Sequence, residues 1–122
     1  ADLATFWRLA REAHWPVSHH YLLYPNPWPK SAHLQRRWHG HPVFPTLLAL
    51  GGRLQLRSNW SIYVEEFCRA AALVTGQEVS ASRLPCGTPP LSPFERKYAA
   101  SGHPLWAATM NLDRAKVAHP IN

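Results

Sequence analysis

Residues 19–30 read His-His-Tyr-Leu-Leu-Tyr-Pro-Asn-Pro-Trp-Pro-Lys, and this stretch decides the fold. Residues 19–24 are a short aromatic and aliphatic run that a proline closes, which is the pattern of a buried strand. Each of the prolines that follow fixes its own φ angle and removes a backbone donor. Residues 25–29 are therefore expected to form a rigid loop at the carboxyl end of that strand.

Helical and strand patterns alternate along the rest of the chain. Apolar spacing and flanking breakers predict helices over 2–14, 45–50, 62–75 and 92–100, with Ser61 as the cap of the third. Further strands are predicted over 53–58, 77–83 and 104–110. This alternation indicates an α/β fold, with a mostly parallel sheet and helices on both faces. Because the link between the last two strands is short, we expect the last strand to be antiparallel.

Two asparagines follow predicted strands. Asn26 lies in the proline loop, and Asn59 follows the strand over 53–58, between Ser58 and Trp60. Ligands of parallel α/β sheets bind beyond the carboxyl ends of the strands, so we expect both loops to face one crevice. Flanking prolines reduce the entropy lost in holding Asn26, although asparagine is also an ordinary turn residue.

The chain is short and basic. Its 122 residues suffice for one domain, and the formal net charge is +6 with histidines neutral. Such a charge favours anionic partners, with nucleic acid as the first candidate, although a solvated basic surface explains it equally well.

The cysteine and histidine patterns predict no metal or disulfide framework. Cys68 and Cys86 match no zinc spacing, and His33, His39 and His41 fit no common metal site. This is the profile of a reducing compartment, so we expect a cytoplasmic protein. No apolar run approaches the roughly 20 residues that cross a bilayer, so no membrane partner is expected. The start has neither a signal peptide nor an initiator methionine, and we expect a piece of a longer chain.

Three motifs in this order resemble the bacterial tRNA (guanine-N7)-methyltransferases. Residues 24–30, followed by His33 and Arg36-Arg37, resemble the family's Phe-Pro-Asp-Pro-Trp-Pro-Lys…His…Arg-Arg signature. Residues 51–60 resemble its Gly-Gly…Thr-Asp-Trp stretch. Residues 92–95, with Gly102-His103 after them, resemble its Thr-x-Phe/Tyr-Glu motif and following Gly-His.

The resemblance implies the C-terminal half of a Rossmann-like methyltransferase sheet, with strands four to seven. Residues 1–112 would form a partial domain that lacks the cofactor-binding N-terminal half, and residues 113–122 a flexible tail. The cofactor, S-adenosyl-L-methionine, would bind in the missing half. No glycine-rich strand-to-helix turn occurs here, because Gly51-Gly52 follows a helix and precedes a strand, the reverse of what a cradle requires.

By resemblance, Asn26 and Asn59 are the catalytic positions, at which the family has aspartates that contact the guanine. An asparagine accepts hydrogen bonds through one oxygen and cannot act as a base near neutral pH. A diverged substrate, a weak enzyme and a lost activity all fit these two changes.

Other candidates for substrate binding have a structural explanation beside the functional one. Trp28 could stack a base or serve as a core lid. Lys30, His33 and Arg36 could neutralise RNA phosphates or form a solvated basic turn. Arg36 and its neighbour Arg37 cannot point the same way in a helix. Ser92 and Glu95 match the family motif, but they also match a helix capping box.

The resemblance implies that the parent protein transfers a methyl group to N7 of a tRNA guanine, and we expect this chain alone to be inactive. The alternative is a non-catalytic RNA-binding remnant of the same fold. Self-association through the exposed edge of the first strand is also expected, since open edges promote pairing.

Overall fold

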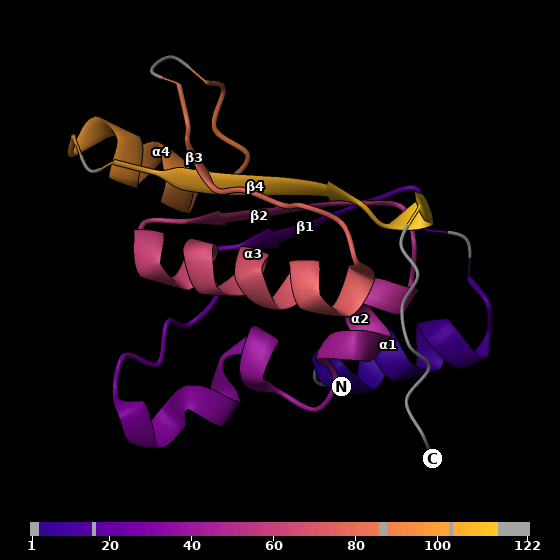
Figure 1. Ribbon diagram of the computed structural model, residues 1–122. Coiled ribbons are helices and arrows are strands. Elements are labelled where there is room, and N and C mark those ends of the chain that lie inside the picture. Colours follow the sequence, from indigo (N-terminus) through magenta and orange to yellow (C-terminus); the bar gives the residue numbers. More distant parts are fainter. Residues whose placement is uncertain (1–2, 16, 86–87, 103, 115–122) are drawn as a thin grey trace.

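A computed structural model describes residues 3–15, 17–85, 88–102 and 104–114 of the chain (Figure 1). Its helices are α1 (Leu3–Glu12), α2 (Phe44–Ala49), α3 (Ser61–Thr75) and α4 (Pro93–Ala100). Its strands are β1 (His19–Leu23), β2 (Arg53–Ser58), β3 (Ser82–Arg83) and β4 (Trp106–Asn111). Short 3-10 turns are η1 (Ser31–Arg36), η2 (Trp38–Gly40) and η3 (Leu112–Arg114).

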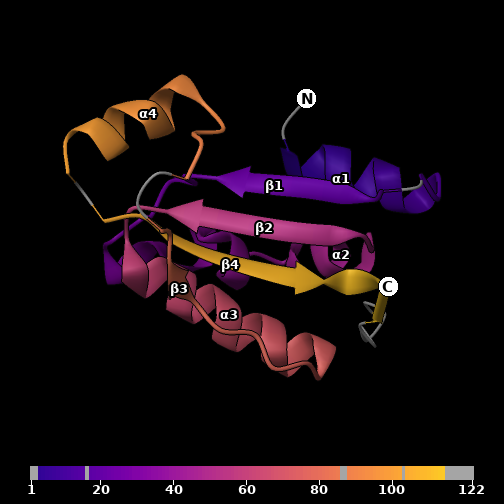
Figure 2. The same cartoon turned by 90° about the horizontal axis from the view of Figure 1, so that it is seen from above.

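The strands form one mixed sheet in the order β1-β2-β4-β3. β1 and β2 are parallel, with His19 opposite Arg53 and Leu23 opposite Arg57. β4 lies between β2 and β3 and is antiparallel to both. Figure 2 shows β1 and β2 pointing one way and β4 the other. The expected α/β fold with an antiparallel last strand is confirmed. The prediction of a mostly parallel sheet is wrong for these strands, because β4 lies between β2 and β3 and makes two of the three pairings antiparallel.

Helices lie on both faces of the sheet, as predicted, but unequally. α1, α2 and α3 lie under one face (Figure 1). The alternation along β2 directs Leu54 and Leu56 into the core on that face, and Arg57 toward the other. There Arg57 meets Glu95 of α4, which lies beyond the carboxyl ends of β1 and β2 (Figure 2).

The core lies between β2 and α3. Leu56 of the strand and Tyr63 and Phe67 of the helix are completely buried. Burying a side chain of this size stabilises the fold by about 1.5–3 kcal/mol. Gly76 ends α3 with a left-handed φ of 72° and donates its N–H to the carbonyl of Ala72. The core thus fixes β2 and α3 together, and with them the loop that carries Asn59.

Gly52 packs tightly at the amino end of β2. A Cβ there would lie 2.4 Å from the carbonyl oxygen of Val17, so only glycine fits this approach. Its N–H donates to the Asp113 Oδ1 atom at 2.7 Å. The predicted flexible tail thus begins with an anchored residue, while residues 115–122 lie outside the described ranges.

Two local predictions are corrected. The strand expected over 77–83 is reduced to Ser82–Arg83. At Gln77 the backbone N–H donates to the Thr75 Oγ1 atom, and the side-chain amide donates to the Asn111 carbonyl. Ser61, predicted as a cap, is the first residue of α3, and the cap position is Trp60.

Candidate functional site

The two predicted asparagine loops leave the same rim of the sheet. β1 and β2 run parallel, and the Tyr24 N–H extends their ladder by donating to the Arg57 carbonyl at 2.8 Å. Asn26 and Asn59 follow directly, and both are exposed. Both loops therefore start at the end of the sheet where α/β folds bind ligands.

The proline loop has a strained backbone at both ends. Tyr24 has a φ of 50° and Trp28 a φ of 45°, and a proline follows each of them. A bulky residue in the left-handed region costs about 1–3 kcal/mol and persists only when the surrounding structure holds it. Inside the loop, the Asn26 Oδ1 atom accepts the Trp28 N–H at 3.1 Å. That oxygen thus also shapes the loop, as in an ordinary asparagine turn.

Trp28 contacts two of the predicted basic residues. The Arg36 guanidinium lies 4.9 Å from the centroid of its ring, and the His33 ring makes an edge contact at 5.5 Å. An open pocket of about 570 Å³ adjoins them. Its lining residues are Asn26, Trp28, Gln35, Arg36, Trp38, His41 and Pro42. Gln35, Trp38 and His41 were not predicted, since only folding brings them to Asn26.

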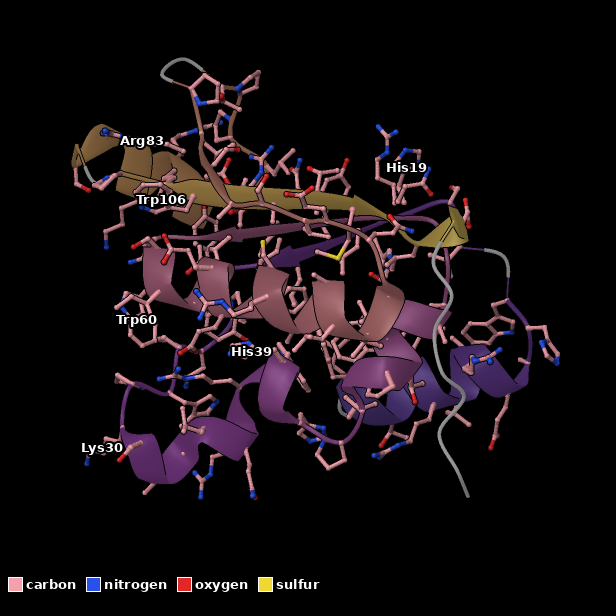
Figure 3. The ribbon with its side chains drawn as sticks, in the orientation of Figure 1. His19, Lys30, His39, Trp60, Arg83 and Trp106 are labelled. Carbon is pink, nitrogen blue, oxygen red and sulfur yellow. The ribbon has the colours of Figure 1, made fainter. Side chains whose placement is uncertain are left out.

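Lys30 and Asn59 lie at the margin of this group. Lys30 is exposed at the start of η1, at the outer edge of the molecule in Figure 3. Asn59 is on the neighbouring loop, next to Trp60. Neither Asn59 nor Lys30 lines the pocket. The structure thus brings Asn26, Trp28, His33 and Arg36 together and leaves the other two beside them.

Arg37 points the opposite way from Arg36, as the helical geometry predicted. It is 4% exposed, whereas Arg36 is exposed. Its Nε–H donates to the Trp28 carbonyl at 3.1 Å, and its Nη1 donates to the Glu66 Oε1 atom at 2.5 Å. Arg37 is therefore paired inside the fold.

Glu66 also bonds to His39, whose Nε2 atom lies 3.1 Å from the same Oε1 atom (His39 is labelled in Figure 3). Burial raises the pKa of Glu66, but hydrogen bonds from His39 and Arg37 outweigh it, so the pKa falls below 4.5. Burial lowers the pKa of His39 below 6.5, against the opposing effect of Glu66. At neutral pH this cluster holds a carboxylate, a guanidinium and a neutral imidazole.

Ser92 and Glu95 form half of a capping box. The Ser92 hydroxyl accepts the Glu95 N–H at 3.1 Å, as the structural explanation predicted. The Glu95 carboxylate is 2% exposed and accepts from the Tyr24 hydroxyl at 2.6 Å and the Arg57 Nη1 at 2.5 Å. These residues lie across the sheet from the Trp28 pocket and reach the proline loop through Tyr24. His103 of the motif lies outside the described residues.

The described glycines do not fit a cofactor cradle. Gly51 and Gly52 lie at the amino end of β2, opposite the rim, where Gly52 packs on the backbone of Val17 and Ser18. Gly40 ends the 3-10 turn η2, and Gly76 and Gly102 follow helices. A cradle requires a glycine turn between a strand's carboxyl end and a helix. Within the described ranges, no three His, Cys, Asp or Glu side chains gather to hold a metal ion.

The described residues of the rim offer several groups for binding a ligand. Asparagine amides offer donors and acceptors, Trp28 offers a ring face or edge, and Arg36 and Lys30 offer positive charge. The carboxylates nearest the rim, Glu66 and Glu95, are both ion-paired. This chemistry suits an aromatic, polar and anionic ligand.

Similar proteins point the same way. Proteins named tRNA (guanine-N(7)-)-methyltransferase match the chain in Thiobacillus denitrificans (31% identity over 91 residues) and Stutzerimonas stutzeri (31% over 93 residues). One from Zymomonas mobilis is 29% identical over 99 residues. Each match covers 70% of this chain, and 40%, 39% and 41% of the three relatives in that order. No family model matches the chain.

The chain is thus related to the tRNA (guanine-N7)-methyltransferases over most of its own length, which confirms the resemblance read from its motifs. It spans about 40% of the length of the curated relatives it matches. In the part of the chain that the structure describes, no helix is long and apolar enough to cross a membrane.

Proposed function

We propose that this chain supplies the substrate-binding part of an S-adenosyl-L-methionine-dependent methyltransferase that modifies N7 of a guanine in tRNA. The single observation that carries the proposal is the common rim from which the loops of Asn26 and Asn59 emerge, beside Trp28 and Arg36. The named relatives support the choice of substrate.

Guanine N7 is already nucleophilic, so catalysis depends mainly on orientation and proximity. In this proposal Asn26 and Asn59 hold the base through their amides, and Trp28 contacts it by stacking. Arg36, Lys30 and His33 contact the RNA backbone. Ser92 and Glu95 contribute from the far side of the sheet by holding Tyr24. Neither asparagine removes a proton. Methylation at N7 does not require the residues that bind the base to do so.

The cofactor, when bound, supplies the methyl group. Because the described glycines form no cradle, we propose that S-adenosyl-L-methionine is held by a part of the enzyme that this chain does not contain. The 122-residue chain would then be inactive alone. Isothermal titration with S-adenosyl-L-methionine tests this: no heat is expected, and micromolar binding would contradict it.

RNA binding by the chain itself is the direct test of the proposal. We expect a labelled tRNA to bind in a filter assay at low salt, with affinity that falls steeply as salt rises. Replacing Asn26 and Asn59 together by alanine should weaken binding, while Arg53→Gln at the opposite end of β2 removes one charge as a control. Equal loss from both variants would indicate nonspecific attraction and contradict the assigned site.

A non-catalytic RNA-binding protein of the same fold is the alternative. The observation that favours it is the Asn26 Oδ1 bond to the Trp28 N–H, which uses the oxygen for loop structure. Restoring aspartate at both positions in the full-length protein separates the two. Methyl transfer that appears only with Asn26→Asp and Asn59→Asp favours the remnant, and transfer by the unaltered protein favours the enzyme.

The protein is proposed to act in the cytoplasm.

The free edge of β1 is proposed to pair with a strand of another molecule. Within the described residues β1 pairs only with β2, and apolar side chains of α1 beneath it are exposed, among them Phe6 and Leu9. Open edges and apolar patches favour association. Light scattering at increasing concentration tests this, and a monomer at millimolar concentration would contradict it.

A further inference from the structure

One buried side chain, Arg37, touches both loops of the candidate site. Its Nε–H holds the Trp28 carbonyl at 3.1 Å, at the end of the proline loop. Its guanidinium carbon lies 4.9 Å from the centroid of the Trp60 ring, next to Asn59. No local sequence pattern requires one residue to reach both, so the contact is a property of the folded rim.

The carbonyl that Arg37 holds belongs to a strained residue. Trp28 has a φ of 45° and precedes Pro29, a combination that requires support from the surrounding structure. The Arg37 guanidinium is itself oriented by Glu66, which is anchored in α3. The chain of contacts therefore runs from a rigid helix through Arg37 to the loop of Asn26.

Arg36 and Arg37 differ in what they can offer an RNA. Arg36 is exposed above the Trp28 ring, where a phosphate can reach it. Arg37 is 4% exposed and its charge is met by Glu66, so it has no counterion to release when RNA binds. The two neighbours are thus separable by experiment.

We infer that Arg37 is a positioning residue, which fixes the loop of Asn26 against the loop of Asn59 and does not itself contact RNA. The expected effect of Arg37 on RNA affinity rests on the proposed function, whereas its expected effect on the two loops does not. An arginine suits this task because its planar fork can bond a carbonyl and a carboxylate while its face lies on an aromatic ring.

The loops are observed directly by fluorine NMR of the chain labelled with 5-fluorotryptophan. Trp28→Phe and Trp60→Phe assign the two resonances. We expect Arg37→Met to shift or broaden both, Glu66→Gln to do so more weakly, and Arg53→Gln to leave them unchanged. If Arg37→Met does not fold, Glu66→Gln carries the test, because Glu66 is partly exposed and its loss leaves the core intact. Unchanged resonances in the folded variants would overturn the inference.

RNA affinity measured across salt separates positioning from contact. We expect Arg37→Met to bind about tenfold more weakly, as for a loop that is competent about a tenth of the time, with an unchanged salt slope. Arg36→Gln should reduce the slope by about one, as for a lost phosphate contact. A reduced slope in Arg37→Met would overturn the inference. If the unaltered chain binds no RNA, the proposed function fails, and the resonances still decide the role of Arg37.

Discussion

Two arginine–glutamate pairs hold the proline loop, one at each end and one on each face of the sheet. Arg57 and Glu95 have side chains that are 8% and 3% exposed, and Glu95 holds Tyr24. The side chain of Arg37 is 5% exposed, but that of its partner Glu66 is 41% exposed, and Arg37 donates to the Trp28 carbonyl. Solvent screens the second pair far more than the first.

This difference separates two tasks of an ion pair. The Arg57–Glu95 pair joins β2 to α4, and leaving one of its charges unpaired in the interior is costly. The Arg37–Glu66 pair contributes less to stability because one partner is partly in water, yet it directs a guanidinium between two loops. We therefore expect the first pair to govern folding and the second to govern the geometry of the rim.

The largest effect is expected for Glu95→Leu, which leaves Arg57 buried without a partner. Breaking a buried pair from one side costs about 3–5 kcal/mol, so the free energy of unfolding should fall by that amount in urea titrations. The double variant Arg57→Met with Glu95→Leu should recover part of the loss, since both charges are then gone. A double variant no more stable than Glu95→Leu would show that the unpaired charge is not the cause.

Tyr24→Phe is expected to have an intermediate effect. It removes one hydroxyl that donates to the Glu95 carboxylate, a charge-assisted bond worth about 1.5–3 kcal/mol. Tyr21→Phe, at an exposed position of β1, is the matched control and should change stability by less than about 0.5 kcal/mol. Urea titration compares the two, and equal stabilities would contradict a structural role for the Tyr24 bond.

Glu66→Gln should cost less, about 1 kcal/mol or below, because its carboxylate is partly solvated. The variant sharpens the comparison, since we expect a small change in stability together with a measurable change at Trp28 and Trp60. Thermal unfolding measures the first. A loss of stability as large as that of Glu95→Leu would show that both ion pairs govern folding, and would contradict the difference proposed between them.

The smallest effect is expected from pH. Burial lowers the pKa of His39 and of His20 below 6.5, so the folded state takes up these protons less readily than the unfolded state. Their contribution to stability is complete above pH 6.5 and declines as the pH falls below it. Glu66 has a pKa lowered from 4.5, so its contribution is lost as the pH falls through that lowered value.

Melting temperatures measured from about pH 8 to about pH 4 test this pH dependence. This range roughly spans the ordinary pKa values of histidine and glutamate. His20→Gln should flatten the decline below pH 6.5, because it removes one of the two imidazoles whose pKa burial lowers. A melting temperature that is constant between these limits would contradict the assignment of neutral, buried histidines.

Much of the scaffold could be predicted from local patterns. The run over 19–24 and its closing proline placed β1, and the apolar spacing with Gly76 placed α3. β3 could not be predicted at its true length, because a weak alternation does not show which of its residues will find a partner on β4, and only Ser82 and Arg83 do. Strand pairing depends on the partner as well as on the segment.

The candidate site was predictable only in part. Asn26, Trp28 and Arg36 were found because their loop follows a strand, and the structure brings them together. Trp38 and His41 were missed as lining residues, because nothing in 38–42 indicates which way the chain turns after η1. The burial of Glu95 was not predicted, because a capping box does not indicate that Arg57 and Tyr24 will meet its carboxylate.

The sequence by itself determined which segments become strands and helices and where the proline loop leaves the sheet, because apolar spacing and proline geometry act over a few residues. The tertiary structure alone decided that Arg37 is buried and Arg36 exposed. A charge can be buried only where a partner meets it, and Glu66 comes from a helix 29 residues further along the chain. The two neighbouring arginines have the same chemistry but different roles, because Glu66 of α3 pairs with Arg37 and Trp28 of the proline loop contacts Arg36.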